Sequence, residues 1–197
     1  MSWLNDRARL QMMASEADIS VRLVEKNSLF WRLLANILQV LRIMKANVFL
    51  DDFATTIGPI IAFPSNWSTE TVENVLTHEL VHVKQARACS FGLHPWIGLP
   101  IFAIAYLFLP IPFGLAYCRF HFELEAEKVR WYKMFKEQTN FVVIDSIAKN
   151  WAKLVSSSSY GWSMPTKWAI ELTSEAIGKL FARYLSELPS GTSVENQ

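Results

Sequence analysis

The chain has few of the residues that define several common classes of protein. It has two cysteines, Cys89 and Cys118, without the close spacing of a cysteine metal site, so we expect reduced thiols in an intracellular protein. Its 19 basic and 18 acidic residues leave a formal net charge of +1, which gives no long-range attraction to nucleic acid or anionic lipid. No basic tract, RNA-binding signature or glycine-rich phosphate loop occurs. Nucleic-acid and nucleotide roles are therefore not expected.

The first twenty residues carry charges throughout and lack the apolar stretch of a secretory signal, so we predict a cytoplasmic location. At 197 residues with 51% hydrophobic side chains, the chain fits one domain, or one domain with an appended helical piece. We expect a mostly α fold with a small β element (α+β). Helical patterns predict N-terminal scaffold helices over residues 1–46, including a mixed helix over 6–26 and an apolar one from Ser28. Residues 47–64 are rich in β-branched and aromatic side chains and predict a short hairpin or two short strands.

Further helices are predicted from Ser68 or Thr69, from about residue 113, and as a C-terminal pair within 138–197 at about 141–155 and 165–187. Between them, residues 96–118 contain no charged side chain and are long enough to span a bilayer. Prolines at positions 100, 110 and 112 interrupt this segment and leave only short proline-free runs. Apolar runs this short are typical of buried or interfacial segments. We expect burial, while contact with a membrane surface, a membrane anchor or a protein partner stay open.

The stretch VLTHELVHVKQ, residues 75–85, places two histidines four positions apart with a glutamate directly after the first. On a helix, His78 and His82 project from one face and offer imidazole nitrogens to one metal ion. Glu79 lies beside them, within reach of a water molecule on that metal. A catalytic zinc site needs a third protein ligand and one position for water. The alternative is a hydrogen-bonded histidine pair on a half-buried helix.

The third ligand is expected from RFHFELEAEKV, residues 119–129. On a helix, Glu123 and Glu127 share an otherwise apolar face, and burying two carboxylates is costly unless a positive partner compensates. A metal ion bound by Glu123 would supply that partner, with Glu127 accepting a hydrogen bond from a zinc-bound histidine. Glu125 points to the other side of the helix. The residues alone rank Glu123 first, Glu125 second and His121 third.

Together, HELVH and ELEAE resemble the gluzincin metallopeptidases, whose second helix supplies a glutamate in a Glu-x-x-x-Asp pattern. The resemblance implies a zincin-like fold, zinc as cofactor, and a metallopeptidase core over residues 47–137. It implies His78, His82 and Glu123 as zinc ligands, Glu79 as the catalytic glutamate, and Glu127 where the family usually has aspartate. It also implies that TTIGPIIAFP is an edge strand that pairs with extended substrate. Within this group, the sequence most resembles the compact, single-domain HExxH proteins that bacteria and tailed bacteriophages encode.

A peptidase also needs a donor for the oxyanion that forms during hydrolysis. Candidates are His94, Tyr117, His121, Tyr132 and Tyr160, although a packing or surface role suits each of them better. We favour Tyr160 because SSSSYGW is a polar stretch of the kind that closes over clefts.

The sequence therefore predicts a zinc-dependent metallopeptidase acting on a peptide or protein substrate. Two alternatives stay open. One is a non-catalytic zincin-fold protein within a larger assembly such as a phage virion. The other is a membrane-associated protease anchored through residues 96–118.

Overall fold

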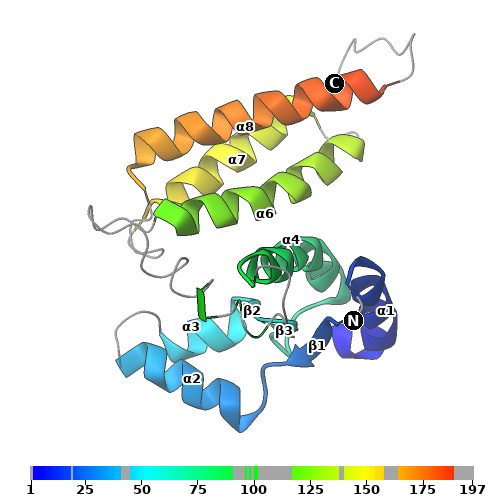
Figure 1. Cartoon of the computed structure of the whole chain (residues 1–197), viewed down its shortest axis with the longest axis vertical. Helices are drawn as coiled ribbons and strands as arrows, with labels where there is room; N and C mark the ends of the chain where they lie inside the picture. Colours follow the sequence, from blue (N-terminus) through cyan, green and yellow to red (C-terminus); the bar gives the residue numbers. More distant parts are fainter. Residues whose placement is uncertain are drawn as a thin grey trace. The chain divides into compact units, whose positions relative to one another are not determined.

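The structure, a computed structural model, describes residues 2–18, 20–40, 45–90, 96, 98, 100–101, 117–137, 140–157 and 164–188. The chain divides into two compact units, unit 1 (residues 1–104) and unit 2 (residues 105–197). Among the described residues, helices predominate and three short strands form one sheet, so the prediction of a mostly α chain with a small β element is confirmed (Figure 1). The boundary between the units falls inside the predicted core, residues 47–137.

Unit 1 contains the sheet. Its described elements are η1 (Trp3–Asp6), α1 (Arg7–Ala17), β1 (Arg22–Glu25), α2 (Leu29–Val40), α3 (Ala46–Asp51), β2 (Thr55–Ile57), β3 (Ile60–Phe63) and α4 (Thr69–Ala88). The predicted helix over residues 6–26 is therefore wrong in its second half, where β1 lies. Val21 and Leu23 are buried while Arg22 between them is exposed, which is the two-residue period of a strand.

The sheet has the order β1-β3-β2, with β3 parallel to β1 and antiparallel to β2. The predicted hairpin is confirmed for β2 and β3. Gly58 occupies its turn with a φ of 56°, a left-handed conformation that glycine adopts at low cost. The expectation that residues 55–64 form one edge strand is wrong, because within this segment β3 is the central strand and only the three-residue β2 lies at an edge of the sheet, with β1 at the other edge. Pro59 falls in the turn, where its missing N–H interrupts no ladder.

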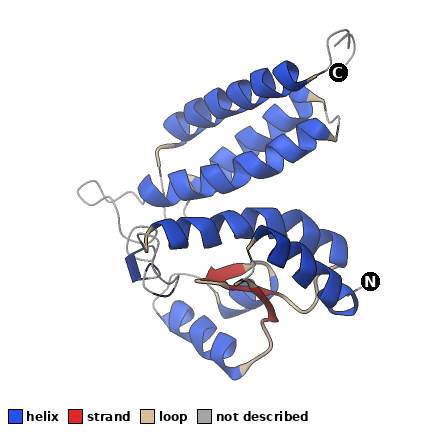
Figure 2. Ribbon diagram, turned by 45° about the vertical axis from the view of Figure 1, so that its right-hand side comes forward, coloured by secondary structure: helices blue, strands red, loops and turns tan. Residues whose placement is uncertain are grey.

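The central strand β3 is apolar throughout because helices cover both of its faces. Ile61 and Phe63 belong to a core shared with α1 and α4, whereas Ile60 and Ala62 pack with α2 and α3. The sheet thus forms the middle layer of unit 1 (Figures 1 and 2). Helix α4 contributes apolar side chains to the first core at helical spacing: Val72, Leu76, Leu80 and Val83. This packing fixes the rotation of α4 about its axis.

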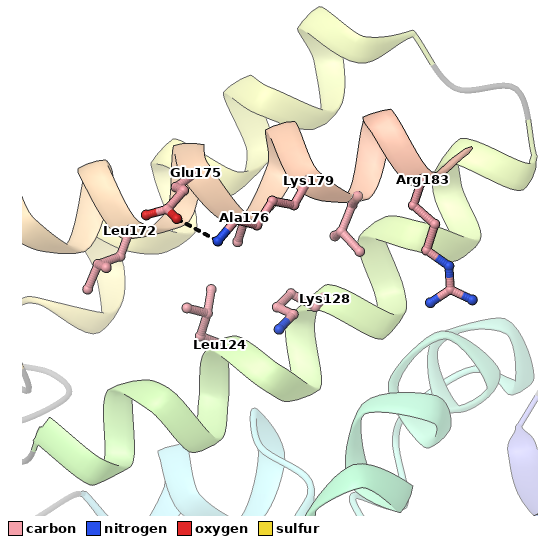
Figure 3. A pocket seen from close by; sticks show the side chains of 8 residues that line it. Leu124, Lys128, Leu172, Glu175, Ala176, Lys179 and Arg183 are labelled. Atoms are coloured by element: carbon pink, nitrogen blue, oxygen red, sulfur yellow. Dashed lines mark hydrogen bonds and ion pairs between the residues drawn. The ribbon is translucent and has the colours of Figure 1, made fainter. Parts of the chain in front are cut away.

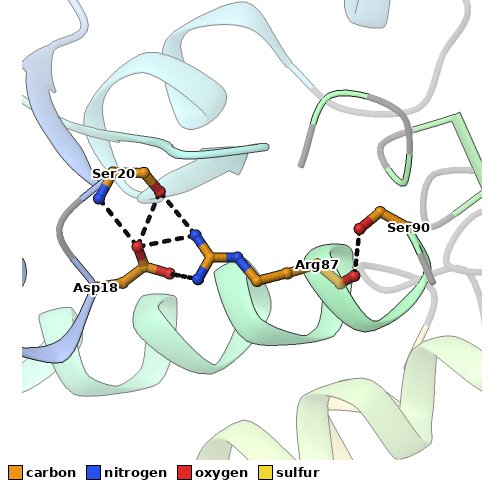
Figure 4. Close-up of polar contacts among 4 residues, drawn as sticks. All are labelled: Asp18, Ser20, Arg87 and Ser90. Atoms are coloured by element: carbon orange, nitrogen blue, oxygen red, sulfur yellow. Dashed lines mark hydrogen bonds and ion pairs between the residues drawn. The ribbon is translucent and has the colours of Figure 1, made fainter. Parts of the chain in front are cut away.

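Both ends of α4 are fixed by side chains. The Ser68 hydroxyl accepts a hydrogen bond from the Thr71 backbone N–H at 3.1 Å, which confirms Ser68 as the N-cap. Near the other end, the Arg87 guanidinium contacts both carboxylate oxygens of buried Asp18, at 2.7 and 2.9 Å, and the Ser20 hydroxyl at 2.9 Å (Figure 4). Such bidentate pairs fix geometry as well as adding energy. Helix α4 is thereby tied to the segment between α1 and β1.

Unit 2 is built from three described helices: α6 (Tyr117–Lys136), α7 (Phe141–Val155) and α8 (Thr166–Glu187). The predicted C-terminal helix pair is confirmed to within one residue at each end. The three helices share an apolar core in which Trp131 and Trp151 meet edge to face, 5.4 Å apart.

Among the residues described, no helix combines the length and apolarity required to cross a lipid bilayer. Most of the uncharged segment 96–118 lies outside the described residues.

Candidate functional site: a histidine pair and a buried glutamate

The two histidines of HELVH lie one helical turn apart on α4 with their rings turned toward each other. Their Nε2 atoms are 3.1 Å apart and their ring centroids 4.9 Å apart, in an edge-to-face arrangement. Two nitrogens bound to one tetrahedral zinc at 2.0–2.1 Å would be roughly 3.3 Å apart. The separation in the structure is therefore compatible with two nitrogens on one metal ion. The same distance is also compatible with a direct hydrogen bond between the two imidazoles.

Gln85, one turn beyond His82, contacts the opposite side of the His82 ring. Its Oε1 lies 2.8 Å from His82 Nδ1. An amide oxygen only accepts hydrogen bonds, so this contact favours the tautomer with the proton on Nδ1 and the lone pair on Nε2. Metal-binding histidines are commonly oriented in this way by a hydrogen bond from their other nitrogen. The sequence analysis missed Gln85, although its position three residues after His82 placed it on the same face of the helix.

Glu79 is buried, and its carboxylate is held by a neighbour from the sheet. The hydroxyl of Thr56, in the edge strand β2, donates a hydrogen bond to Glu79 Oε2 at 2.6 Å. This bond fixes the carboxylate orientation and leaves Oε1 available for another proton. Sequence reasoning missed Thr56, because 23 positions separate it from Glu79 and no local pattern relates them.

A buried lysine lies behind this part of the sheet. Lys26 Nζ donates hydrogen bonds to the carbonyl oxygens of Phe49 and Phe53 at 2.8 and 2.7 Å, and lies 4.0 Å from the centre of the Phe49 ring. Burial lowers the pKa of the Lys26 ammonium from 10.5 to about 7, and the negative charge of Glu79 acts in the opposite direction. These contacts fix the turn between α3 and β2, and so the strand that carries Thr56.

The predicted acidic residues lie on α6 of unit 2, and the two sides of that helix differ as the sequence indicated. Glu123 and Glu127 are buried, and Glu127 Oε2 is 3.1 Å from Arg130 Nη2. Glu125 is exposed and pairs with Lys128 at 2.6 Å. A buried carboxylate is stable only beside hydrogen-bond donors or a positive charge, as at a metal site, whereas Glu125 is solvated and paired with a lysine. Among the acids of ELEAE, this distinction favours Glu123 over Glu125 as a ligand.

The structure describes the side chains of two candidate oxyanion donors, Tyr132 and His121. The Tyr132 hydroxyl donates a short hydrogen bond to Glu187, and its ring lies against Arg183, so it connects α6 with α8. His121 is partly buried on α6, and burial lowers the pKa of its imidazole. Tyr160 and His94 fall outside the described residues, as does the side chain of Tyr117. The prediction for Tyr160 therefore stays a prediction.

A groove between α6 and α8 within unit 2 is lined partly by cations (Figure 3). Each cation is paired with a carboxylate of its own helix: Lys128 with Glu125, Lys179 with Glu175, and Arg183 with Glu187. These ion pairs neutralise the groove, so we assign no anionic ligand to it.

Comparison of the chain with models of protein families, with curated proteins and with solved structures found no match in any of the three.

Proposed function

We propose that this protein is a zinc-dependent metallopeptidase of the gluzincin type. The observation that carries the proposal is the arrangement on α4: two imidazole Nε2 atoms 3.1 Å apart, next to a buried glutamate whose carboxylate is held by Thr56. A purely structural zinc site commonly fills four positions with protein ligands and has no use for such a glutamate. The combination supports a site in which a base acts beside a metal.

His78 and His82 would hold the zinc through Nε2, with Gln85 orienting His82. Glu123 would supply the third ligand, since imidazole and carboxylate together suit zinc and leave a fourth position for water. Burial of Glu123 and exposure of Glu125 support this choice. Glu127 would lie behind the ligands, where a carboxylate can accept a hydrogen bond from a ligating histidine.

Bound zinc would act as a Lewis acid that makes a water molecule more acidic and a peptide carbonyl more electrophilic. Glu79 would take the proton from the attacking water on Oε1 and deliver it to the leaving amine. Thr56 would keep the carboxylate in position for both transfers. A residue in this role accelerates hydrolysis only while its carboxylate is ionised at the start of the cycle.

The edge strand β2 suggests how a substrate is held. An extended peptide can add to an exposed strand edge through backbone hydrogen bonds, which bind many sequences without regard to side chains. Because Thr56 is the middle residue of β2, a peptide on this edge would pass near Glu79. We therefore propose unfolded or flexible peptide segments as the substrate class.

The test combines metal analysis with hydrolysis of a quenched fluorescent peptide library. Wild-type protein should bind one equivalent of zinc and cleave the library. Glu79→Gln should keep the zinc and lose at least about 100-fold in kcat, because it removes only the base. His78→Ala should lose both zinc and activity.

Glu123→Gln and Glu125→Gln form a matched pair on the same helix. The first should weaken zinc binding, whereas the second should leave both zinc and activity unchanged, since Glu125 is exposed and paired with Lys128. Absence of zinc from the metal-replete wild type would end the proposal. Zinc binding without any hydrolysis would instead favour a non-catalytic zinc protein.

A further inference from the structure

Helix α2 is apolar on two different sides, and only one of them faces the core of unit 1. Trp31 and Ala35 are buried against α3 and β3, with Leu34 and Leu38 packed beside them. A second row of large apolar side chains is exposed, and we call it the apolar α2 face: Leu29, Phe30, Leu33, Ile37 and Val40. These residues recur at the three- and four-residue spacing that aligns them along the helix.

This second row is unusual for a helix on the surface of a small unit. Such a helix normally buries one apolar stripe and presents polar residues elsewhere. Here Leu29 is 72% and Val40 81% exposed, so the row extends over the whole length of α2. A contiguous exposed apolar row of this kind typically marks an interaction surface.

Over residues 26–50, which include α2, the charged side chains have a single sign. Between Glu25 and Asp51 the sequence has no acidic residue, whereas it has basic ones at positions 26, 32, 42 and 45. Lys26 is buried, but Arg32 and Lys45 are exposed. The net charge of +1 for the whole chain therefore includes one segment, residues 26–50, whose charged side chains are all basic.

We propose that the apolar α2 face docks unit 1 onto the surface of an anionic lipid bilayer, with α2 lying in the plane of the interface. An amphipathic helix with large apolar side chains on one face and basic residues near its polar face has this property. Leu, Phe and Ile enter the headgroup boundary, while Arg32 and Lys45 contact anionic headgroups. A helix of 12 residues is too short to span the bilayer, so it lies flat.

Charge favours a bilayer over a second copy of the chain. A symmetric dimer through the apolar α2 face would bring the basic residues of both copies together without an acidic partner between residues 26 and 50. Helix α2 also lies on the opposite face of the sheet from α4 (Figure 1). Docking through α2 would therefore leave the α4 side of the sheet away from the lipid. Docking through α2 requires neither metal binding nor hydrolysis.

The experiment is flotation of the full chain with vesicles of phosphatidylcholine, with or without phosphatidylglycerol. Wild-type protein should float with the anionic vesicles and much less with neutral ones. Leu33→Glu/Ile37→Glu places two charges on the row and should lower vesicle affinity at least about tenfold. Arg32→Gln and Lys45→Gln should each lower affinity about fivefold at low salt, and less at high salt.

Val142→Glu/Val143→Glu is the matched control, because these α7 valines are 70% and 48% exposed, similar to Leu33 at 53% and Ile37 at 54%. This control should bind vesicles like the wild type, and circular dichroism should show that both variants fold. Undiminished binding of Leu33→Glu/Ile37→Glu would overturn the proposal and move the contact elsewhere, for example to residues 96–118. No vesicle binding by the wild type would also overturn it. In that case, dissociation of an oligomer by the same variant, seen in sedimentation velocity, would identify a self-association surface.

Discussion

Replacing Lys26 with methionine removes a buried ammonium group but keeps a side chain of similar length, and it should flatten the dependence of unit 1 stability on pH. In the folded protein, burial lowers the pKa of Lys26 to about 7, against 10.5 for an exposed lysine. Between these two values the unfolded chain carries a proton that the folded protein has released. The free energy of unfolding therefore rises with pH in this window and is flat below it.

One pKa unit corresponds to about 1.36 kcal/mol, so the wild type should gain about 2.5 kcal/mol between pH 6 and pH 9 from this group. The Lys26→Met protein should lack that gain. It should also be destabilised at pH 9, because the carbonyls of Phe49 and Phe53 lose their hydrogen-bond donor.

The assay is guanidinium unfolding of both proteins at pH 6, 7, 8 and 9 at constant ionic strength, followed by tryptophan fluorescence. The other titratable groups contribute equally to the free energy of unfolding of both proteins, so their contributions cancel when one pH profile is subtracted from the other. Lys167→Met serves as the control, since that side chain is 84% exposed and should leave the pH profile unchanged. Parallel profiles for wild type and Lys26→Met would refute the reasoning that burial shifts this lysine.

Three further predictions each concern one side chain. Gln85→Leu should weaken zinc binding about 10- to 100-fold in a chelator competition, because His82 loses the partner of its Nδ1; an unchanged Kd would exclude an orienting role for Gln85. Asp18→Asn should lower the free energy of unfolding at pH 7 by about 1–3 kcal/mol, because the charged partner of Arg87 is lost. Burial acts to raise the pKa of Asp18, but hydrogen bonds from Ser20 and Arg87 lower it overall, so the difference should shrink as the pH falls through the folded-state pKa; a constant difference down to pH 2 would contradict this. Ile144→Ala should cost about 2–5 kcal/mol in urea unfolding, because it leaves a cavity in the fully buried core of unit 2; a loss below about 1 kcal/mol would show that this core is not tightly packed.

Local patterns predicted the long helices well. The Ser68 cap, the four-residue apolar spacing of α4 and the strong amphipathic pattern of α7 all depend on neighbours in sequence. The strand β1 was missed for the converse reason. Four residues directly after a helix give a weak signal, and β1 exists because it pairs with residues 60–63, far along the chain.

One feature of the candidate site and one of the surface also depended on non-local packing. Thr56 reaches Glu79 because β2 packs on α4, and the sequence contains no sign of that pairing. The apolar residues of α2 predicted a scaffold helix, and a helix is present. Hydrophobicity alone, however, does not distinguish the side occupied by Trp31 from the side that leaves Ile37 exposed.

The sequence by itself determined that His78 and His82 share one side of a helix, because a four-residue separation is close to one helical turn and needs no other part of the chain. It also determined that Glu123 and Glu125 point in different directions from one helix. Only the tertiary structure decided which hydroxyl holds Glu79, which lysine is buried behind the sheet, and which apolar side of α2 stays in contact with solvent. These depend on how distant segments pack together, and packing is set by the shape and volume of the assembled core rather than by any local pattern.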